Sequence, residues 1–246
     1  MKIALAQIKS NKDDLEENIQ KHLQYIKKAI QQQADLIAFP ELSLTAYEPS
    51  LAKKSAIFPQ EERLKIFQQL SNKGNISIAL GVATTNEADA IFISMLLFQL
   101  QQPLQIYNKR YLHTDELPYF QAGNQAVFFN IKNQRIAPAI CYESLRIEHA
   151  KEAAEQGSHI YLASVAKPAR GLEKAFVHYP KIAKQYQMTV LMVNNIGYCD
   201  NFESAGQSAA WNKEGQLIAQ LGKAEEDLLL VEVTKSMLID KIFVSK

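Results

Sequence analysis

Short apolar runs of strand length alternate with helical segments twice along the chain, and this order restricts the possible folds more than any other feature. The first helical segment carries Leu15, Ile19 and Leu23 at a spacing of four residues, so one face of that helix is apolar. The continuous apolar runs are typical of strands buried on both faces. The elements expected in the first half are strands at 2–8, 34–39 and 76–83, helices at 15–30 and 61–70, and two hairpin-like strands at 91–98 and 104–109.

The same order of elements starts again at residue 135, as a repeat of order rather than of residue letters. A hairpin with its turn at 212–215 follows the second set of strands and helices. The elements expected in this half are strands at 135–141, 159–165 and 189–195, helices at 147–157 and 173–187, the hairpin at 206–221, and a last strand at 227–233.

Strands that are separated by helices pair in parallel, with the helices on the faces of the sheet. Two such halves predict an α/β fold in the form of a four-layer α-β-β-α sandwich, although the order of elements also fits two three-layer halves side by side. We expect one domain, 1–246, because layered α/β folds often reach the length of this chain.

Charge and cysteine content narrow the class of protein. The 27 basic and 26 acidic residues leave a formal charge of +1, which indicates neither nucleic acid nor a membrane surface as a partner. The first residues lack the pattern of a signal peptide, and no apolar run reaches the ~18 residues of a membrane span. Two cysteines, Cys141 and Cys199, cannot form a disulfide framework, so free thiols are expected. We therefore expect a cytoplasmic protein.

Three reactive side chains follow the ends of predicted strands: Glu41 in "LIAFPEL", Lys109 in "LQIYNK" and Cys141 in "RIAPAIC". Ligands of parallel sheets gather beyond the carboxyl ends of the strands, so we expect the three groups to share one edge. A lone cysteine at a strand end is more often a small buried hydrophobe. A thiol beside a base and a cation is instead typical of nucleophilic catalysis, because the thiolate is the reactive form.

The segments "FPE", "YNK" and "CYE" around these residues occur in the order found in the nitrilase superfamily of carbon-nitrogen hydrolases, which the chain resembles along nearly its whole length. The resemblance implies a sandwich of the carbon-nitrogen hydrolase type. It also implies Glu41 as general base, Lys109 as the cation at the oxyanion, Cys141 as nucleophile and Glu116 as a second carboxylate in the same pocket.

Two departures from the family pattern leave the sub-family open. Tyr111 or Leu112 stands where the family often has histidine, and Ile147 and Glu148 stand without the proline of the family's Phe-Pro-Glu segment. Neither departure touches the Glu-Lys-Cys triad.

The resemblance also implies a thioester mechanism. Glu41 would accept the thiol proton as sulfur attacks an amide carbonyl, and would then donate it to the departing amine. The Lys109 ammonium and the backbone N–H of Tyr142 would bind the oxyanion. Glu116 is expected to orient Lys109 or the leaving group rather than to act as a second base, because two nearby carboxylates raise each other's pKa unless the lysine lies between them.

Loops beyond the strand ends supply the candidates for substrate contact. Lys167 and Arg170 follow the strand at 159–165 and could bind a substrate carboxylate or remain solvated charges. Phe120 and Phe202 fall near the same loops, and Cys199 is expected in a loop as a plain thiol. The five histidines show no paired spacing of metal ligands, so no metal site is expected. The predicted substrate-binding residues are Tyr47, Tyr119, Tyr142, Ala166 and Lys167.

We interpret the chain as an amidase that needs no cofactor and hydrolyses a small linear amide, releasing ammonia or an amine. N-carbamoyl amines and nitriles use the same triad and remain alternatives, and a non-catalytic member that binds a metabolite or partner protein is an alternative of another class. A papain-like protease would need a partner histidine and a C-G-x-C-W pattern, which "AICYES" lacks. The resemblance also implies a homo-oligomer, here a dimer formed through 143–156 and 172–187.

Overall fold

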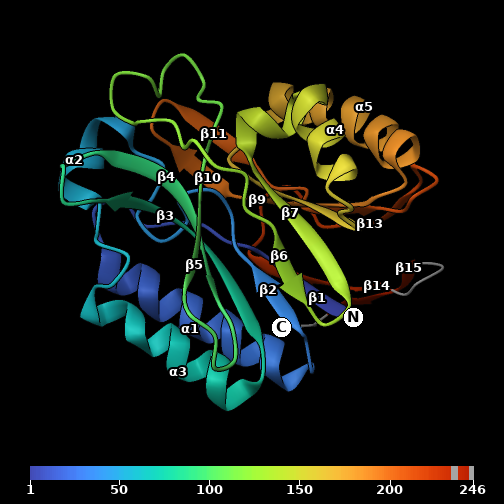
Figure 1. Cartoon of the computed structure of the whole chain (residues 1–246), viewed down its shortest axis with the longest axis horizontal. Helices are drawn as coiled ribbons and strands as arrows, with labels where there is room; N and C mark the ends of the chain where they lie inside the picture. The colour runs from blue at the N-terminus through green and yellow to red at the C-terminus, as the bar shows by residue number, and fades with distance from the viewer. Residues whose placement is uncertain (234–237, 244–246) are drawn as a thin grey trace.

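Two β-sheets lie face to face between two layers of helices (Figure 1). Helices α1 (Leu15–Gln31) and α3 (Lys65–Gly74) cover the first sheet, and α4 (Ile147–Glu155) and α5 (Ala169–Tyr186) cover the second. The computed structural model describes residues 1–233, and the backbone of 238–243.

The first sheet has seven strands, of which β1, β2 and β3 pair in parallel. The two strands after β3 extend the sheet as an antiparallel meander, as the sequence predicts. In spatial order its strands are β15 (Leu238–Phe243), β14 (Asp227–Val233), β1 (Lys2–Gln7), β2 (Leu36–Ala38), β3 (Ser77–Thr85), β4 (Ile91–Phe98) and β5 (Gln105–Asn108).

The second sheet has six strands, of which β7, β8 and β9 pair in parallel. The separate hairpin of β10 (Ile196–Cys199) and β11 (Phe202–Ala205) leaves this sheet after β9. In spatial order the strands of the sheet are β13 (Leu217–Gln220), β12 (Ala209–Trp211), β9 (Thr189–Asn194), β8 (Ile160–Val165), β7 (Gln134–Ile140) and β6 (Phe129–Ile131).

Three hydrophobic cores hold the layers together, because successive side chains of each strand point to opposite faces of its sheet. Ile3 of β1 packs in the core between the two sheets, which also contains Leu162 of β8. The next residue, Ala4, belongs to the core under the first helical layer, together with Ile26 of α1. A third core joins β7, β8 and β9 to α4 and α5. This arrangement confirms the four-layer α-β-β-α sandwich and excludes two separate three-layer halves.

The helices begin where local signals and buried apolar faces coincide. The Asp14 carboxylate accepts a hydrogen bond from the backbone N–H of Glu17, which caps α1 at the start of its apolar stripe. Helix α5 begins at Ala169, four residues before the predicted start at 173, with Pro168 as its N-cap residue. None of the helices in the described part of the chain is long and apolar enough to cross a membrane.

The predicted end of the fold is wrong in one respect. The strand at 227–233, β14, is not the last strand, because β15 pairs with it in antiparallel fashion. Moreover, β14 returns to the first sheet and pairs with β1, so the second half of the chain completes the sheet of the first. Alternation of strands and helices predicts the elements but not which sheet a late strand joins.

Three short strands lie where the sequence predicts no strand. Strand β6 has only three residues, and β10 and β11 carry too few consecutive apolar residues to be recognised by pattern. Cys199, expected in a loop, is therefore the last residue of β10 and is buried. The predicted hairpin turn at 212–215 is present, with Gly215 at a φ of 81°.

Candidate active site

A buried lysine lies between two carboxylates at the ends of the first sheet's strands. Lys109 follows β5, and its Nζ lies 2.7 Å from Oε1 of Glu41, which follows β2. The same Nζ lies 2.6 Å from Oε1 of Glu116. All three side chains are at most 1% exposed. One ammonium therefore separates two carboxylates that would otherwise repel each other, as the sequence predicts for Glu116.

Two further donors hold Glu116 in place. The Tyr47 hydroxyl donates to Oε1 of Glu116 at 2.9 Å, and the backbone N–H of His113 donates to Oε2 at 2.8 Å. Glu41 differs, because its Oε2 is buried and has no hydrogen-bond partner among the described residues. Of the two carboxylates, Glu41 is thus the one with an oxygen free to accept a proton.

Burial and charge shift the pKa values of these groups in a direction that suits proton transfer. Burial raises the pKa of Glu41 to about 7, with the charge of Glu116 adding to the rise and the charge of Lys109 opposing it. Burial alone would lower the pKa of Lys109, but the two carboxylates outweigh it and raise that pKa. Lys109 therefore stays charged, while Glu41 can exchange a proton near neutral pH.

Cys141 begins the short 3-10 helix η3 (Cys141–Leu145) directly after β7, and its backbone is in the left-handed region with a φ of 46°. A non-glycine residue in this region is strained, and such strain collects at functional sites. Its carbonyl accepts a hydrogen bond of 2.5 Å from the Ser144 hydroxyl. The sharp turn presents the thiol to a cavity, with Sγ 3.6 Å from the carbonyl oxygen of Ala166.

The Cys141 thiol is not a preformed thiolate. Burial, followed by the charge of Glu41, raises its pKa to about 11, although the charges of Lys167 and Lys109 lower it. Because a neutral thiol is a poor nucleophile, this cysteine needs a base that takes its proton at the moment of attack. Glu41, with its raised pKa and free oxygen, meets that need.

Glu143 connects the segment of Lys109 to the turn of Cys141, and sequence reasoning missed it. Its Oε1 accepts from the Tyr107 hydroxyl at 2.6 Å and from the backbone N–H of Ile140 at 2.7 Å. Its Oε2 accepts from the backbone N–H groups of Arg110 and Tyr111 at 2.8 and 3.2 Å. The one available signal was a charged residue directly after Cys-Tyr, just beyond the end of a predicted strand.

Close backbone contacts fix the loop that carries Glu41. The Asn195 side chain, after β9, donates from Nδ2 to the backbone carbonyl of Glu41 at 3.0 Å. On β3, a Cβ added to Gly81 would lie 2.0 Å from the carbonyl oxygen of Pro40 and 2.8 Å from the backbone nitrogen of Leu42. Only glycine allows this approach of strand and loop, so Gly81 determines where Glu41 is placed.

A cavity of about 580 Å³ opens above Cys141. Four of the five predicted substrate-binding residues line it: Tyr47, Tyr142, Ala166 and Lys167. The structure does not bring the fifth, Tyr119, into the lining, and its side chain is 44% exposed. The other lining residues are His113, Asp115, Glu116, Cys141, Leu145, Pro168, Arg170, Gly171, Lys174, Asn201 and Phe202.

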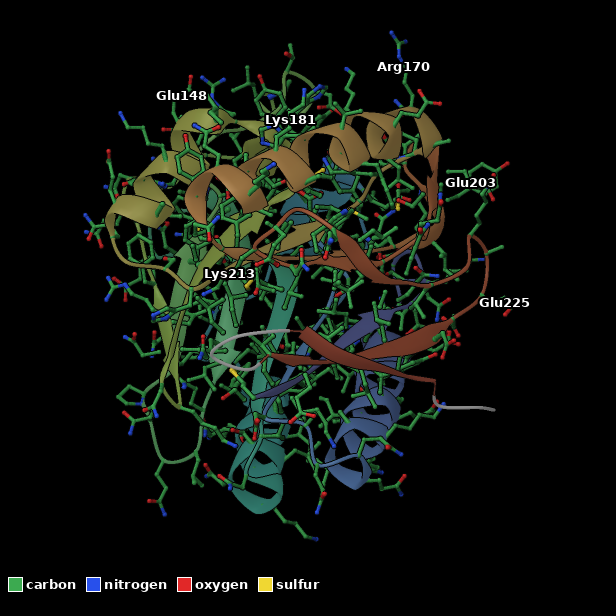
Figure 2. All side chains as sticks on the ribbon, turned by 90° about the vertical axis from the view of Figure 1, so that its right-hand side faces the viewer. Glu148, Arg170, Lys181, Glu203, Lys213 and Glu225 are labelled. Atoms are coloured by element: carbon green, nitrogen blue, oxygen red, sulfur yellow. The ribbon has the colours of Figure 1, made fainter. Side chains whose placement is uncertain are left out.

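The two remaining aromatic candidates and Arg170 take different places. Phe202 of β11 lines the cavity and packs edge-on against Tyr47, with ring centroids 5.5 Å apart. Phe120 is buried in the core between the sheets instead. Arg170, in the first turn of α5, lies at the rim, and Figure 2 shows its side chain extending outward from the helix. No group of three or more His, Cys, Asp or Glu side chains suited to a metal ion occurs in the described residues.

The chain is similar in sequence to known proteins. The family model described as "Carbon-nitrogen hydrolase" matches residues 2–241. The glutamine-dependent NAD(+) synthetase of Acinetobacter baylyi is 26% identical over 248 residues, which cover 94% of this chain and 44% of that protein. The chain thus spans less than half the length of this curated relative.

Solved structures share the fold. The glutamine-dependent NAD+ synthetase from Acinetobacter baumannii, in complex with ADP, superposes with a TM-score of 0.84 and 25% identity over 95% of this chain and 45% of that chain. The amidase from Nesterenkonia sp. AN1, in complex with butyramide, superposes with a TM-score of 0.87 and 21% identity over 95% of this chain and 90% of that chain. The second likeness, at its low identity, shows the shared fold.

Proposed function

This chain belongs to the carbon-nitrogen hydrolase family, and from that premise we propose that it hydrolyses a small linear amide through a thioester on Cys141. The observation that carries the proposal is the buried Glu41–Lys109–Glu116 network at a cavity that exposes the Cys141 thiol. The network supplies a base whose pKa is near 7 and a cation that stays charged.

The first half of the reaction forms the thioester. Oε2 of Glu41 takes the thiol proton as the sulfur electron pair forms a bond to the amide carbon, and the carbonyl oxygen gains a negative charge. When the tetrahedral intermediate collapses, its C–N bond breaks and Glu41 returns the proton to the nitrogen. Ammonia leaves from a primary amide, and the acyl group stays on Cys141.

Two donors stabilise the oxyanion. The Lys109 ammonium is held by two carboxylates and stays protonated. The backbone N–H of Tyr142 lies in the first turn of η3, where amide groups have no acceptor within the helix. Each donor of this kind contributes about 3 kcal/mol to the transition state in comparable sites.

The second half of the reaction releases the acid. Once ammonia has left, Glu41 is again a carboxylate and takes a proton from a water molecule that attacks the thioester carbon. The C–S bond breaks, the sulfur recovers a proton, and the carboxylic acid leaves. Glu116 does not exchange protons in this scheme, because its two oxygens are occupied by Lys109, Tyr47 and the backbone N–H of His113.

The cavity and the relatives together suggest which amides to test. A volume of about 580 Å³ is in the range of sites for small molecules. The curated relatives include glutamine-dependent NAD(+) synthetases, which makes glutamine, itself a primary amide, one candidate substrate. N-carbamoyl amines and nitriles could react with the same thiol and remain alternatives, as does a member that only binds a metabolite.

The test is ammonia release from glutamine, ω-amides of dicarboxylic acids, simple aliphatic amides, N-carbamoyl amines and nitriles. We expect release from at least one amide by the wild type and none above background by Cys141→Ala. The matched control is Cys199→Ala, which removes the buried thiol of β10 and should retain activity.

The substrate that gives the highest kcat/KM identifies the class. Turnover of nitriles or N-carbamoyl amines alone would replace the amidase assignment by one of those activities. If the wild type released no ammonia from any compound, or if Cys141→Ala released as much as the wild type, the proposed function would be wrong.

A further inference from the structure

A second buried ammonium, that of Lys167, lies beside the nucleophile. Lys167 follows β8, its residue is only 3% exposed, and its Nζ lies 3.9 Å from Sγ of Cys141. The same Nζ donates to the carbonyl oxygen of Cys141 at 3.2 Å. Within the described part of the chain, no carboxylate lies within 4.0 Å of this ammonium. A buried charge without an opposite charge is unfavourable, so its retention requires an explanation.

The charges of the site supply that explanation. Lys109 lies between Glu41 and Glu116, so these three groups together carry one net negative charge when both carboxylates are ionised. A thiolate formed beside them would add a second negative charge in a buried place. The Lys167 ammonium makes the set of four groups neutral. Transfer of the thiol proton to Glu41 then leaves the whole site neutral as well.

We propose that Lys167 is a further catalytic residue of this chain, whose ammonium is the counter-ion of the Cys141 thiolate during attack. The inference rests on the proposed function in taking Cys141 as the nucleophile. It assigns to Lys167 a contact with the reacting sulfur, in place of the substrate carboxylate contact that the sequence suggested.

The backbone of Lys167 is fixed in a way that suits this role. Its N–H donates to Oδ1 of Asn194 at 2.8 Å, and its carbonyl accepts from Nδ2 of Asn194 at 3.1 Å and from the backbone N–H of Ala205 at 3.0 Å. A Cβ on Gly171 would lie 3.3 Å from Cβ of Lys167, so the absence of a side chain there makes room for the lysine stem. The backbone that carries the ammonium is therefore held by β9 and β11, beside the first turn of α5.

Other charged groups around Cys141 are accounted for. The negative charges of Glu41 and Glu116 raise the pKa of Cys141 and so disfavour the thiolate. The positive charge of Lys109 lowers that pKa, but its ammonium is already shared between the two carboxylates. The positive charge of Lys167 lowers the pKa of Cys141 more than that of Lys109 does. On α5, Arg170 and Lys174 line the same cavity, as do His113 and Asp115 from the loop after β5. Also on α5 are Tyr179, whose hydroxyl hydrogen-bonds to Ser144, and His178, whose pKa is lowered by burial and then by the charge of Lys167. The buried thiol of Cys199 lies in the β10–β11 hairpin.

The test is the rate at which iodoacetamide, a neutral reagent, alkylates Cys141 as a function of pH, read as the mass of the Cys141 peptide. In Lys167→Met we expect the rise of the alkylation rate with pH to begin about one to three pH units higher, because an opposite charge within about 4–6 Å lowers a pKa by that amount. Alkylation at pH 7 should slow at least about tenfold. Lys167→Arg, which keeps the charge, should restore most of the rate.

The control variant is Lys181→Met, which removes one positive charge from the exposed face of α5, the helix that follows Lys167 (Figure 2). It should leave the alkylation profile unchanged. Lys167→Gln is measured beside Lys167→Met, so that a variant that fails to fold does not end the test. Cooperative urea unfolding identifies the variants that are folded.

The outcomes separate the inference from the proposed function. If Lys167→Met or Lys167→Gln is folded and keeps the wild-type profile, Lys167 is not the counter-ion and the inference is overturned. An unchanged profile combined with a higher KM for anionic amides alone would assign Lys167 to the substrate carboxylate instead. Alkylation requires no substrate, so a moved profile supports the inference even where the proposed amide hydrolysis fails.

Discussion

Replacing Glu143 by glutamine changes one oxygen of a fully buried carboxylate into an NH2 group. The carboxylate now accepts four hydrogen bonds, from the Tyr107 hydroxyl and from the backbone N–H groups of Ile140, Arg110 and Tyr111. An amide has one acceptor oxygen. If that oxygen keeps the two bonds on the side of Arg110, the NH2 group faces the N–H of Ile140, and this buried donor loses its partner.

The expected cost follows from these contacts. A buried N–H without a partner costs about 1–3 kcal/mol, and hydrogen bonds to a charged acceptor contribute more than those to a neutral one. The neutral side chain is easier to bury than the carboxylate, whose pKa is raised by burial, and this offsets part of the loss. We expect Glu143→Gln to lower the free energy of unfolding by about 3 kcal/mol, which corresponds to a fall of roughly 6–12 °C in Tm for a chain of this size.

Urea unfolding and thermal melting measure this change, and kcat measures its effect on the site. Because Glu143 positions the segment before Cys141 and the segment after Lys109, kcat should fall even at a temperature where the variant is fully folded. The control is Glu148→Gln, a nearby carboxylate that is 63% exposed and extends outward in Figure 2, and it should change stability by less than about 0.5 kcal/mol. A loss below about 1 kcal/mol in Glu143→Gln would refute the reasoning.

Three further predictions concern pH and backbone packing. Glu116→Gln should move the acid limb of the pH profile of kcat/KM to a lower pH than its wild-type midpoint near pH 7, because the charge of Glu116 helps raise the pKa of Glu41. An acid limb that stays in place or moves to higher pH contradicts this assignment. Burial lowers the pKa of His149 to about 4. As pH falls below about 6.5, His149 therefore takes up a proton in the unfolded chain before it does so in the folded chain. The stability difference between the wild type and His149→Gln should therefore shrink by about 2 kcal/mol from pH 7 to pH 5, measured by urea unfolding, and a constant difference would count against a buried neutral imidazole. Gly81→Ala should lower the free energy of unfolding by about 3 kcal/mol and remove most of kcat, because the new Cβ meets the carbonyl oxygen of Pro40. A crystal structure of this variant in which the loop that carries Glu41 has not moved would disprove this.

Strand ends made part of the site predictable from the sequence. Glu41, Lys109 and Cys141 each follow an apolar run, and the structure brings the first two into contact and presents the third to the adjoining cavity. The roles given to these residues stay predictions, as does the dimer expected through 143–156 and 172–187.

Other parts of the site depend on contacts that no local pattern reveals. Three of the four donors to Glu143 come from a segment more than thirty residues away: the Tyr107 hydroxyl in β5 and the backbone N–H groups of Arg110 and Tyr111 after it. The burial of Lys167 depends on packing against Asn194 and Gly171, while its sequence neighbours, Pro168 and Arg170, suggest an exposed loop. For the same reason the return of β14 to the first sheet could not be predicted, because its apolar residues fit either sheet.

The central claim is a thioester on Cys141, and mass spectrometry during turnover of the best amide tests it most directly. We expect the Cys141 peptide of the quenched wild type to carry the mass of the acyl group, which is the mass of the amide less that of ammonia. The adduct should be absent from Cys141→Ala and still present on Cys141 in Cys199→Ala. Steady turnover with no acyl adduct at any quench time, together with undiminished ammonia release by Cys141→Ala, would contradict the account.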